Sequence, residues 1–218
     1  MTKGGLFERV AAREASPAAV SSERSERFHV LSVCTGNICR SPVSEAIWRG
    51  WAARVPGVSS ESAGVGAVVG RPMEPAALAI SQPWWSAAEQ FRARQIDESM
   101  TQAADLVLVM SAGQRHEVLQ MDPSALHRTF LVRDLDAVLE ALVGGGDRAA
   151  ESDAGAPAGE SAVHRAHRLI GQAARRRDLA ERPQEVTDPF RLPREQQDAI
   201  LTELGTVINR IAGRLLGR

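Results

Sequence analysis

Short apolar runs alternate with stretches of helical periodicity along most of the chain. Residues Phe28–Val33 (FHVLSV) predict a short strand, and Pro42–Trp51 then places apolar side chains at helical spacing. A tight loop joins the two segments. The order strand, loop, helix is therefore expected where the fold begins, at Phe28.

The same alternation continues downstream. Further strands are predicted at Val58–Ala63, Asp105–Met110 and Arg128–Val132, and further helices at Glu74–Ser81, from Ser111 onward and over Leu135–Leu142. Ser111 and Gln114 form a capping-box pattern, in which each side chain satisfies a free amide at the helix start. A closing helix is indicated by apolar positions from Ile200 to Leu215, with Pro193 near its start. Strands that alternate with helices predict an α/β fold, with a parallel sheet covered on both faces.

Three segments depart from this pattern. Residues 1–27 lack a sustained apolar stripe and are expected to form a mobile N-terminal extension, and Gly144–Glu160, with three consecutive glycines and four acids, is expected to be a linker. Ser161–Glu181 is predicted to be a basic helix, either with a solvated face or with a site for a partner. We expect a single domain over residues 28–218, with a Gly/Ala-rich insertion around 144–182.

Composition and charge narrow the class of protein. The chain has 218 residues, 44% of them hydrophobic, which is typical of a globular protein with a buried core. Its net charge of −1 creates no general attraction for nucleic acid or an anionic membrane. No apolar stretch approaches the roughly 18 residues of a membrane span, and the first 27 residues carry charges throughout. We therefore expect a cytoplasmic protein without a nucleic-acid or membrane partner; its oligomeric state is left open.

Candidate chemistry is concentrated in residues 33–42 (VCTGNICRSP). They place the thiol of Cys34 at the carboxyl end of a predicted strand, where open α/β sheets bind ligands. A loop that turns directly into a helix points several amides at one spot, and the partial positive charge of the helix adds to them. This arrangement suits a phosphate dianion, and the same field favours the nucleophilic thiolate form of Cys34.

The residues around Cys34 fit the same chemistry. The planar guanidinium of Arg40 can bind two phosphate oxygens at once, and Ser41 can donate its hydroxyl to the sulfur. Gly36 and Asn37 suit left-handed backbone conformations that turn amides inward. An inert, buried Cys34 is the alternative. No second Cys or His pair stands at zinc-ligand spacing, so neither a metal nor another cofactor is expected.

The stretch Cys34–Pro42 resembles the signature loop of the low-molecular-weight protein tyrosine phosphatases. The resemblance extends through Ser62–Gly64, Gly70–Pro75, Arg92–Gln95, Ala104–Met110 and Arg128–Phe130. It implies a flavodoxin-like sheet of four parallel strands, of the phosphotyrosine protein phosphatase I type. It also implies hydrolysis of a phosphorylated protein or small aryl phosphate through a phosphocysteine intermediate. The residues implied to bind phosphate beside Cys34 and Arg40 are Thr35, Gly36, Asn37, Ile38, Cys39 and Ser41.

The resemblance further implies a catalytic acid in an Asp-Pro pair, which here is Asp188–Pro189. The carboxyl of such a residue protonates the leaving oxygen and then accepts a proton from water. Asp122–Pro123 is a competing candidate, but it follows a helical run and is typical of a turn. We therefore expect Asp188 to be the acid.

Several positions depart from the family pattern. Gly66–Val69 stands where many members carry an aromatic residue, so one aromatic wall of the substrate slot near Ala67 is expected to be missing. Phe190 stands where tyrosine is frequent. The neighbouring Trp84 and Trp85 are expected to pack in the core rather than contact a ligand.

Two other functions stay open. An arsenate reductase would need an external thiol, because no cysteine follows Cys39. A protein that binds a phosphorylated ligand without turnover is the second. We also hypothesise a reversible disulfide between Cys34 and Cys39 that shields the nucleophile from oxidation, with Cys39 as a packed small residue the alternative.

Overall fold

The computed structural model describes residues 26–143, 159–180 and 184–217. The expected N-terminal extension lies outside the described residues except for Glu26 and Arg27. The expected linker likewise lies outside them except for Gly159 and Glu160.

Four parallel strands form one sheet in the order β2-β1-β3-β4. The strands are β1 (Phe28–Cys34), β2 (Val58–Gly64), β3 (Leu106–Val109) and β4 (Thr129–Leu131). The register pairs Cys34 with Gly64 on β2 and Val33 with Val109 on β3, so three strands end at the same edge. The sequence prediction of a flavodoxin-like parallel sheet is confirmed, with each predicted strand within one or two residues of its position.

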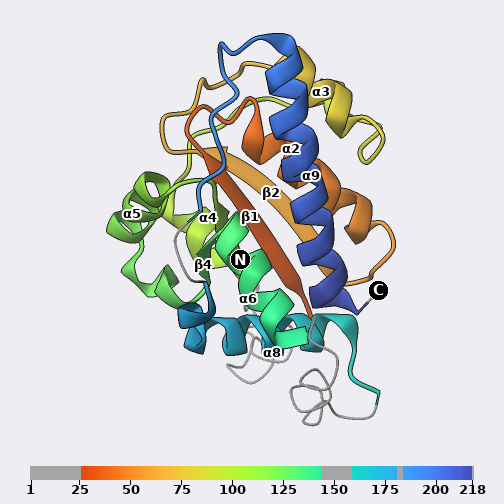
Figure 1. The fold of residues 1–218 in the computed structure, drawn as a ribbon, viewed down its shortest axis with the longest axis vertical. Helices are drawn as coiled ribbons and strands as arrows, with labels where there is room; N and C mark the ends of the chain where they lie inside the picture. Colours follow the sequence, from red (N-terminus) through yellow and green to blue (C-terminus); the bar gives the residue numbers. More distant parts are fainter. Residues whose placement is uncertain (1–25, 144–158, 181–183, 218) are drawn as a thin grey trace, which may run out of the picture.

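Helices cover both faces of the sheet (Figure 1). The larger layer contains α2 (Arg40–Ala52), α3 (Pro75–Ser81), α6 (Val132–Val143), α8 (Ala162–Arg175) and α9 (Arg194–Leu216), and the smaller layer contains α4 (Glu98–Ala103) and α5 (Ala112–Met121). Alternate side chains of β1 and β3 enter the two layers, as the pleat of a strand requires. Three short 3-10 helices, Ala88–Gln90, Pro123–His127 and Arg177–Leu179, join these elements.

The capping box predicted at Ser111 is only half correct. Ser111 Oγ accepts a hydrogen bond from Gln114 N at 3.3 Å and so caps α5. The side chain of Gln114, however, accepts from Met110 N and donates to Thr35 Oγ1 at 3.1 Å. Gln114 therefore connects α5 to the loop that follows β1 instead of closing its own helix.

The predicted basic helix is present as α8, and its apolar side chains enter the main core. They pack with α6 and α9, and they are Val163, Ala166, Leu169, Ile170 and Ala173. The helix ends at Arg175 and not near Glu181 as predicted. Arg177, on the 3-10 helix that follows, is not solvated as expected: it is half-buried 3.9 Å from the Phe130 ring centroid and donates to the carbonyl oxygens of Leu126 and Thr129. Burial lowers the pKa of Arg177 to about 10. No helix among the described residues is long and apolar enough to span a membrane.

We propose that α8 is part of a single domain over residues 28–218. Replacing the fully buried Leu169 by Ala should then lower the free energy of unfolding of the whole domain by about 2–5 kcal/mol, because it leaves a cavity in the shared core. Urea unfolding followed by circular dichroism measures this change. The exposed Arg175→Ala on the same helix should alter it by less than about 0.5 kcal/mol. An unchanged main transition in Leu169→Ala would show α8 to be a separate appendage.

Candidate active site

A pocket of about 200 Å³ opens at the carboxyl end of β1. It is lined by Cys34, Thr35, Gly36, Ile38, Cys39, Arg40, Gly66, Val68, Asp188 and Phe190. Most of these residues belong to the segment 34–41, here called the Cys34–Ser41 loop, which runs from the end of β1 into the first turn of α2. The edge of the sheet therefore holds the candidate nucleophile at the start of a helix, where backbone amides and the helix dipole favour an anion.

The sulfur of Cys34 lies among hydrogen-bond donors. Cys34 is only 2% exposed, and its access to solvent is through the pocket that it lines. The amide of Asn37 donates to Cys34 Sγ at 3.3 Å, and Ser41 Oγ lies 3.0 Å from the same sulfur. Both groups can hold a negative charge on this sulfur.

Asn37 gives the loop its shape. Its backbone is left-handed, with a φ of 54°, whereas Gly36 is not among the residues with positive φ, contrary to the sequence prediction for that glycine. The side-chain amide of Asn37 donates to Ser41 Oγ at 2.9 Å and to Ser62 Oγ at 2.8 Å. Its side-chain oxygen accepts from the backbone amide of Arg94 at 2.8 Å. These contacts hold a conformation that is otherwise unfavourable for a residue with a Cβ.

Arg40 is 5% exposed, and the three nitrogens of its guanidinium have different surroundings. Its Nη2 pairs with Asp188 Oδ2 at 2.7 Å, and Nη1 donates to the carbonyl oxygen of Val186 at 3.1 Å. Its buried Nε has no hydrogen-bond partner within the described part of the chain. A buried donor without a partner is costly, and Arg40 is one of the residues that line the pocket.

Asp188 stands at the mouth of the pocket with about half of its side chain exposed. The segment that carries it is anchored to the end of β3, because Val186 N donates to Met110 O at 2.9 Å. The rival Asp122 is buried elsewhere, where it accepts from Ser124 and pairs with Arg128 at 2.9 Å. Asp122 therefore stabilises a turn, as its sequence predicts.

The sequence placed the segment Gly66–Val69 and Phe190 at the substrate slot, but it did not single out Val68 as a wall residue. Val68 and the exposed Phe190 form its apolar wall together with Ile38, and no tryptophan lines it. Trp84 and Trp85 pack against the main core, as predicted. The spacing of Val68 in a Gly- and Ala-rich loop carried no signal, because its position depends on the backbone hydrogen bond from Val68 N to Gly36 O.

Cys39 differs from Cys34 in its surroundings. Burial raises the pKa of the Cys39 thiol to about 12, with smaller contributions from the negative charges of Cys34, Glu74 and Asp188. Both thiols are free and both line the pocket, and a disulfide between them stays a prediction. In the described ranges, no three Cys, His, Asp or Glu side chains gather closely enough to hold a metal ion.

Comparison with known sequences relates the chain to one enzyme family. The model of the low molecular weight phosphotyrosine protein phosphatase family matches residues 29–142. A probable low molecular weight protein-tyrosine-phosphatase, EpsP of Ralstonia solanacearum, is 37% identical over 107 residues, which are 49% of this chain and 72% of EpsP. The corresponding phosphatase Wzb of Escherichia coli strain K12 is 33% identical over 103 residues, 47% of this chain and 68% of Wzb.

Solved structures show the same fold. The YwlE arginine phosphatase from Geobacillus stearothermophilus superposes with a TM-score of 0.57 at 25% identity, over 86% of this chain and 92% of YwlE. The tyrosine phosphatase Wzb from Escherichia coli K30, in complex with phosphate, gives a TM-score of 0.56 at 22% identity, over 89% and 96% of the two chains.

The close approach of β2 to the Cys34–Ser41 loop gives a first test of the site. A Cβ on Gly64 would lie 2.3 Å from Thr35 O and 3.0 Å from Asn37 N, which are backbone atoms, so the clash is relieved only if the loop itself shifts. Gly64→Ala should therefore lower the free energy of unfolding by about 1–3 kcal/mol, displace the loop and weaken inhibition by inorganic phosphate. The matched variant Gly171→Ala on α8, with no atom closer than 3.9 Å, should bind phosphate as the wild type does. Equal inhibition of both variants would contradict this geometry.

The two thiols should react differently with iodoacetate. At pH 7 only about one part in 10⁵ of a thiol with a pKa near 12 is ionised, so Cys39 should remain unlabelled. Cys34, which faces amide and hydroxyl donors, should be carboxymethylated, and inorganic phosphate should protect it. Peptide mass spectrometry of the full-length protein distinguishes the two sites, and labelling at Cys39 ahead of Cys34 would contradict the assignment.

Proposed function

Because the chain belongs to the low molecular weight phosphotyrosine protein phosphatase family, we propose that it hydrolyses phosphotyrosine-type phosphomonoesters through a phosphocysteine intermediate. One observation carries the proposal. Cys34 Sγ lies in a pocket that also holds the guanidinium of Arg40, and Arg40 pairs with Asp188 at 2.7 Å. A nucleophile, an anion-binding group and a proton donor thus share one small space, as phosphoryl transfer through a covalent intermediate requires.

In the first step, the thiolate of Cys34 attacks phosphorus and the bond from phosphorus to the leaving oxygen breaks. Asp188 gives its proton to that oxygen, because a phenolate leaves poorly unless it is protonated. Arg40 and the amides of the Cys34–Ser41 loop stabilise the charge on the equatorial oxygens. The phosphoryl group is then bonded to the sulfur.

In the second step, water attacks phosphorus and the bond from phosphorus to sulfur breaks. Asp188, now ionised, takes the proton from the water and is ready for the next cycle. Ser41, with Oγ 3.0 Å from the sulfur, can stabilise the thiolate that leaves. Inorganic phosphate is released, and no cofactor takes part.

The pocket favours an aryl group next to the phosphate. Its walls are the side chains of Ile38, Val68 and Phe190, which are apolar, and Phe190 offers a face for an aromatic ring. YwlE is described as an arginine phosphatase, but among the residues lining this pocket only Asp188 carries a carboxylate that could bind a guanidinium. We therefore propose a phosphotyrosine protein or a small aryl phosphate as the substrate.

Two substitutions test the reaction. Cys34→Ser should abolish hydrolysis of p-nitrophenyl phosphate, because the nucleophile is lost. Asp188→Asn should lower kcat by about 10²–10⁴ and leave inhibition by inorganic phosphate close to the wild-type value, because only the proton donor is removed. Steady-state kinetics on both variants measures these effects.

The second Asp-Pro pair supplies a matched control. Asp122→Asn should keep the wild-type kcat, because Asp122 pairs with Arg128 in a turn outside the pocket. Retained turnover in Cys34→Ser would end the proposal. Turnover of phosphoarginine faster than that of phosphotyrosine would replace the proposed substrate class. Thiol-dependent arsenite production above phosphatase turnover would indicate an arsenate reductase. Binding of phosphate without any turnover would indicate a binding protein.

A further inference from the structure

The segment 184–188 carries the proposed proton donor, yet it belongs to no helix or strand. Its position therefore depends on the individual contacts that it makes. Val186 is buried, its N donates to Met110 O at 2.9 Å, and its carbonyl oxygen accepts from Arg40 Nη1 at 3.1 Å. One anchored residue fixes where the segment passes, but it does not fix the direction in which the chain continues to Asp188.

Glu185 supplies a second anchor through its side chain. Its Oε1 accepts a hydrogen bond from Ala112 N at 2.8 Å. Ala112 is the first residue of α5, and Met110, the partner of Val186, lies just before this helix. Adjacent residues of the segment are therefore bound to the same short stretch between β3 and α5, which fixes direction as well as position.

The start of α5 explains why a carboxylate is held there. The first amides of a helix have no partner within the helix, and the helix dipole favours a negative charge beside them. Ser111 Oγ accepts from the amide of Gln114, and the first turn of α5 contains no acidic residue. Glu185 therefore supplies both an acceptor and a negative charge, and a hydrogen bond of this kind is stronger than one between neutral groups.

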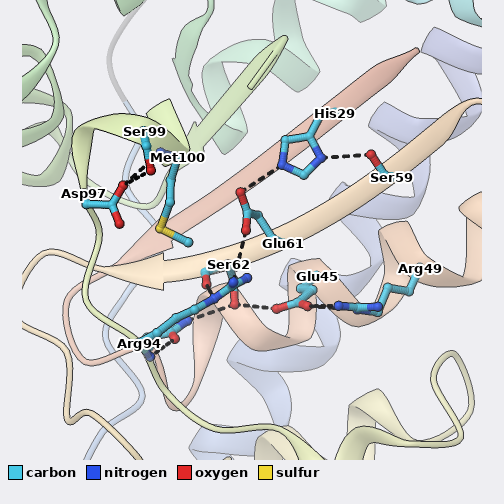
Figure 2. Close-up of polar contacts among 11 residues, drawn as sticks. His29, Glu45, Arg49, Ser59, Glu61, Ser62, Arg94, Asp97, Ser99 and Met100 are labelled. Atoms are coloured by element: carbon cyan, nitrogen blue, oxygen red, sulfur yellow. Dashed lines mark hydrogen bonds and ion pairs between the residues drawn. The ribbon is translucent and has the colours of Figure 1, made fainter. Parts of the chain in front are cut away.

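Helix α4, in the same layer, obtains its carboxylate locally. Asp97 is the residue before this helix, and its Oδ1 accepts from Met100 N at 3.0 Å (Figure 2). This bond spans three residues and stabilises its own helix. The bond from Ala112 to Glu185 spans 73 residues, so it also sets the place of the segment that ends in Asp188.

We propose that Glu185 is a positioning residue: by accepting from Ala112 N, it directs the segment so that the carboxyl of Asp188 meets the leaving oxygen of the substrate. The proposal rests on the proposed function, in which Asp188 is the proton donor. Glu185 is not among the residues that line the pocket, so it acts on the reaction only through Asp188. A purely structural role, in which Glu185 only stabilises α5, is the competing explanation.

The test compares two substrates that differ in their need for the proton donor. p-Nitrophenolate spreads its charge over the nitro group and leaves readily, whereas phenolate leaves poorly unless it is protonated. Glu185→Ala should lower kcat/KM for phenyl phosphate about tenfold and that for p-nitrophenyl phosphate by less, because a misplaced acid matters most for the poorer leaving group. Inhibition by inorganic phosphate should stay close to the wild-type value.

The conservative variant separates the hydrogen bond from the charge. Glu185→Gln keeps an oxygen that can accept from Ala112 N but loses the negative charge, so it should recover part of the activity on phenyl phosphate. Glu185 is exposed, so both of its variants should fold. Activity of Glu185→Gln on phenyl phosphate that is no higher than that of Glu185→Ala would contradict the role of the hydrogen bond.

Two matched controls remove helix caps that do not hold the segment. Ser111→Ala acts on the same helix, and Asp97→Ala removes a carboxylate from the start of α4. Each should lower thermal stability and leave the ratio of the two kcat/KM values as it is in the wild type. If either control changed this ratio as much as Glu185→Ala does, the effect would belong to a weakened helix and the proposal would be overturned.

A double variant shows whether Glu185 acts through Asp188. In Asp188→Asn there is no acidic proton to place, so adding Glu185→Ala should lower kcat/KM for p-nitrophenyl phosphate no further. Equal losses with and without Asp188, or an unchanged ratio in Glu185→Ala, would overturn the proposal. Wild-type kcat/KM in Asp188→Asn itself would instead overturn the proposed function on which it rests.

Discussion

The left-handed backbone of Asn37, with a φ of 54°, is the constraint on which the Cys34–Ser41 loop depends. This conformation costs a residue with a Cβ about 1–2 kcal/mol. Three hydrogen bonds of its side chain offset the cost, to Ser41, to Ser62 and from the amide of Arg94. In this conformation, the backbone amide of Asn37 points at Cys34 Sγ. One side chain thus joins the start of α2, the end of β2 and the segment before α4 around the sulfur.

The parallel sheet is the second constraint on the site, because its register sets how closely β2 approaches the Cys34–Ser41 loop. Cys34 and Gly64 are register partners, and a Cβ on Gly64 would meet the backbone of Thr35 at 2.3 Å. The sheet order 2-1-3-4 also places β1 between β2 and β3, where the direction of strand connection reverses and a crevice opens at the carboxyl ends. The pocket lies at this reversal, so the fold and the site have the same origin.

The sequence predicted the sheet well because the strand of each unit is a short, continuous apolar run, as in Asp105–Met110, which contains β3. It also located the Cys34–Ser41 loop, because a strand that turns directly into a helix restricts the chain to a tight turn. It could not predict the partners of that loop. Ser62 and Arg94 lie 25 and 57 residues from Asn37, and their hydrogen bonds exist only once the strands have paired. The same limit explains Gln114, whose local capping pattern was correct for its amide and wrong for its side chain.

The position of Asp188 depends on the group that would bind the phosphate. Its side chain is half exposed, and within its own segment Asp188 Oδ1 accepts a hydrogen bond from Phe190 N at 3.1 Å. Arg40 adds contacts from outside the segment, because its Nη2 holds Asp188 while Nη1 holds the carbonyl oxygen of Val186. The remaining nitrogen, Nε, is the one without a partner in the described residues. Arg40 therefore links the pocket to the carboxylate of Asp188 through one buried side chain, and a lysine, with a single point charge, could not make both of these contacts.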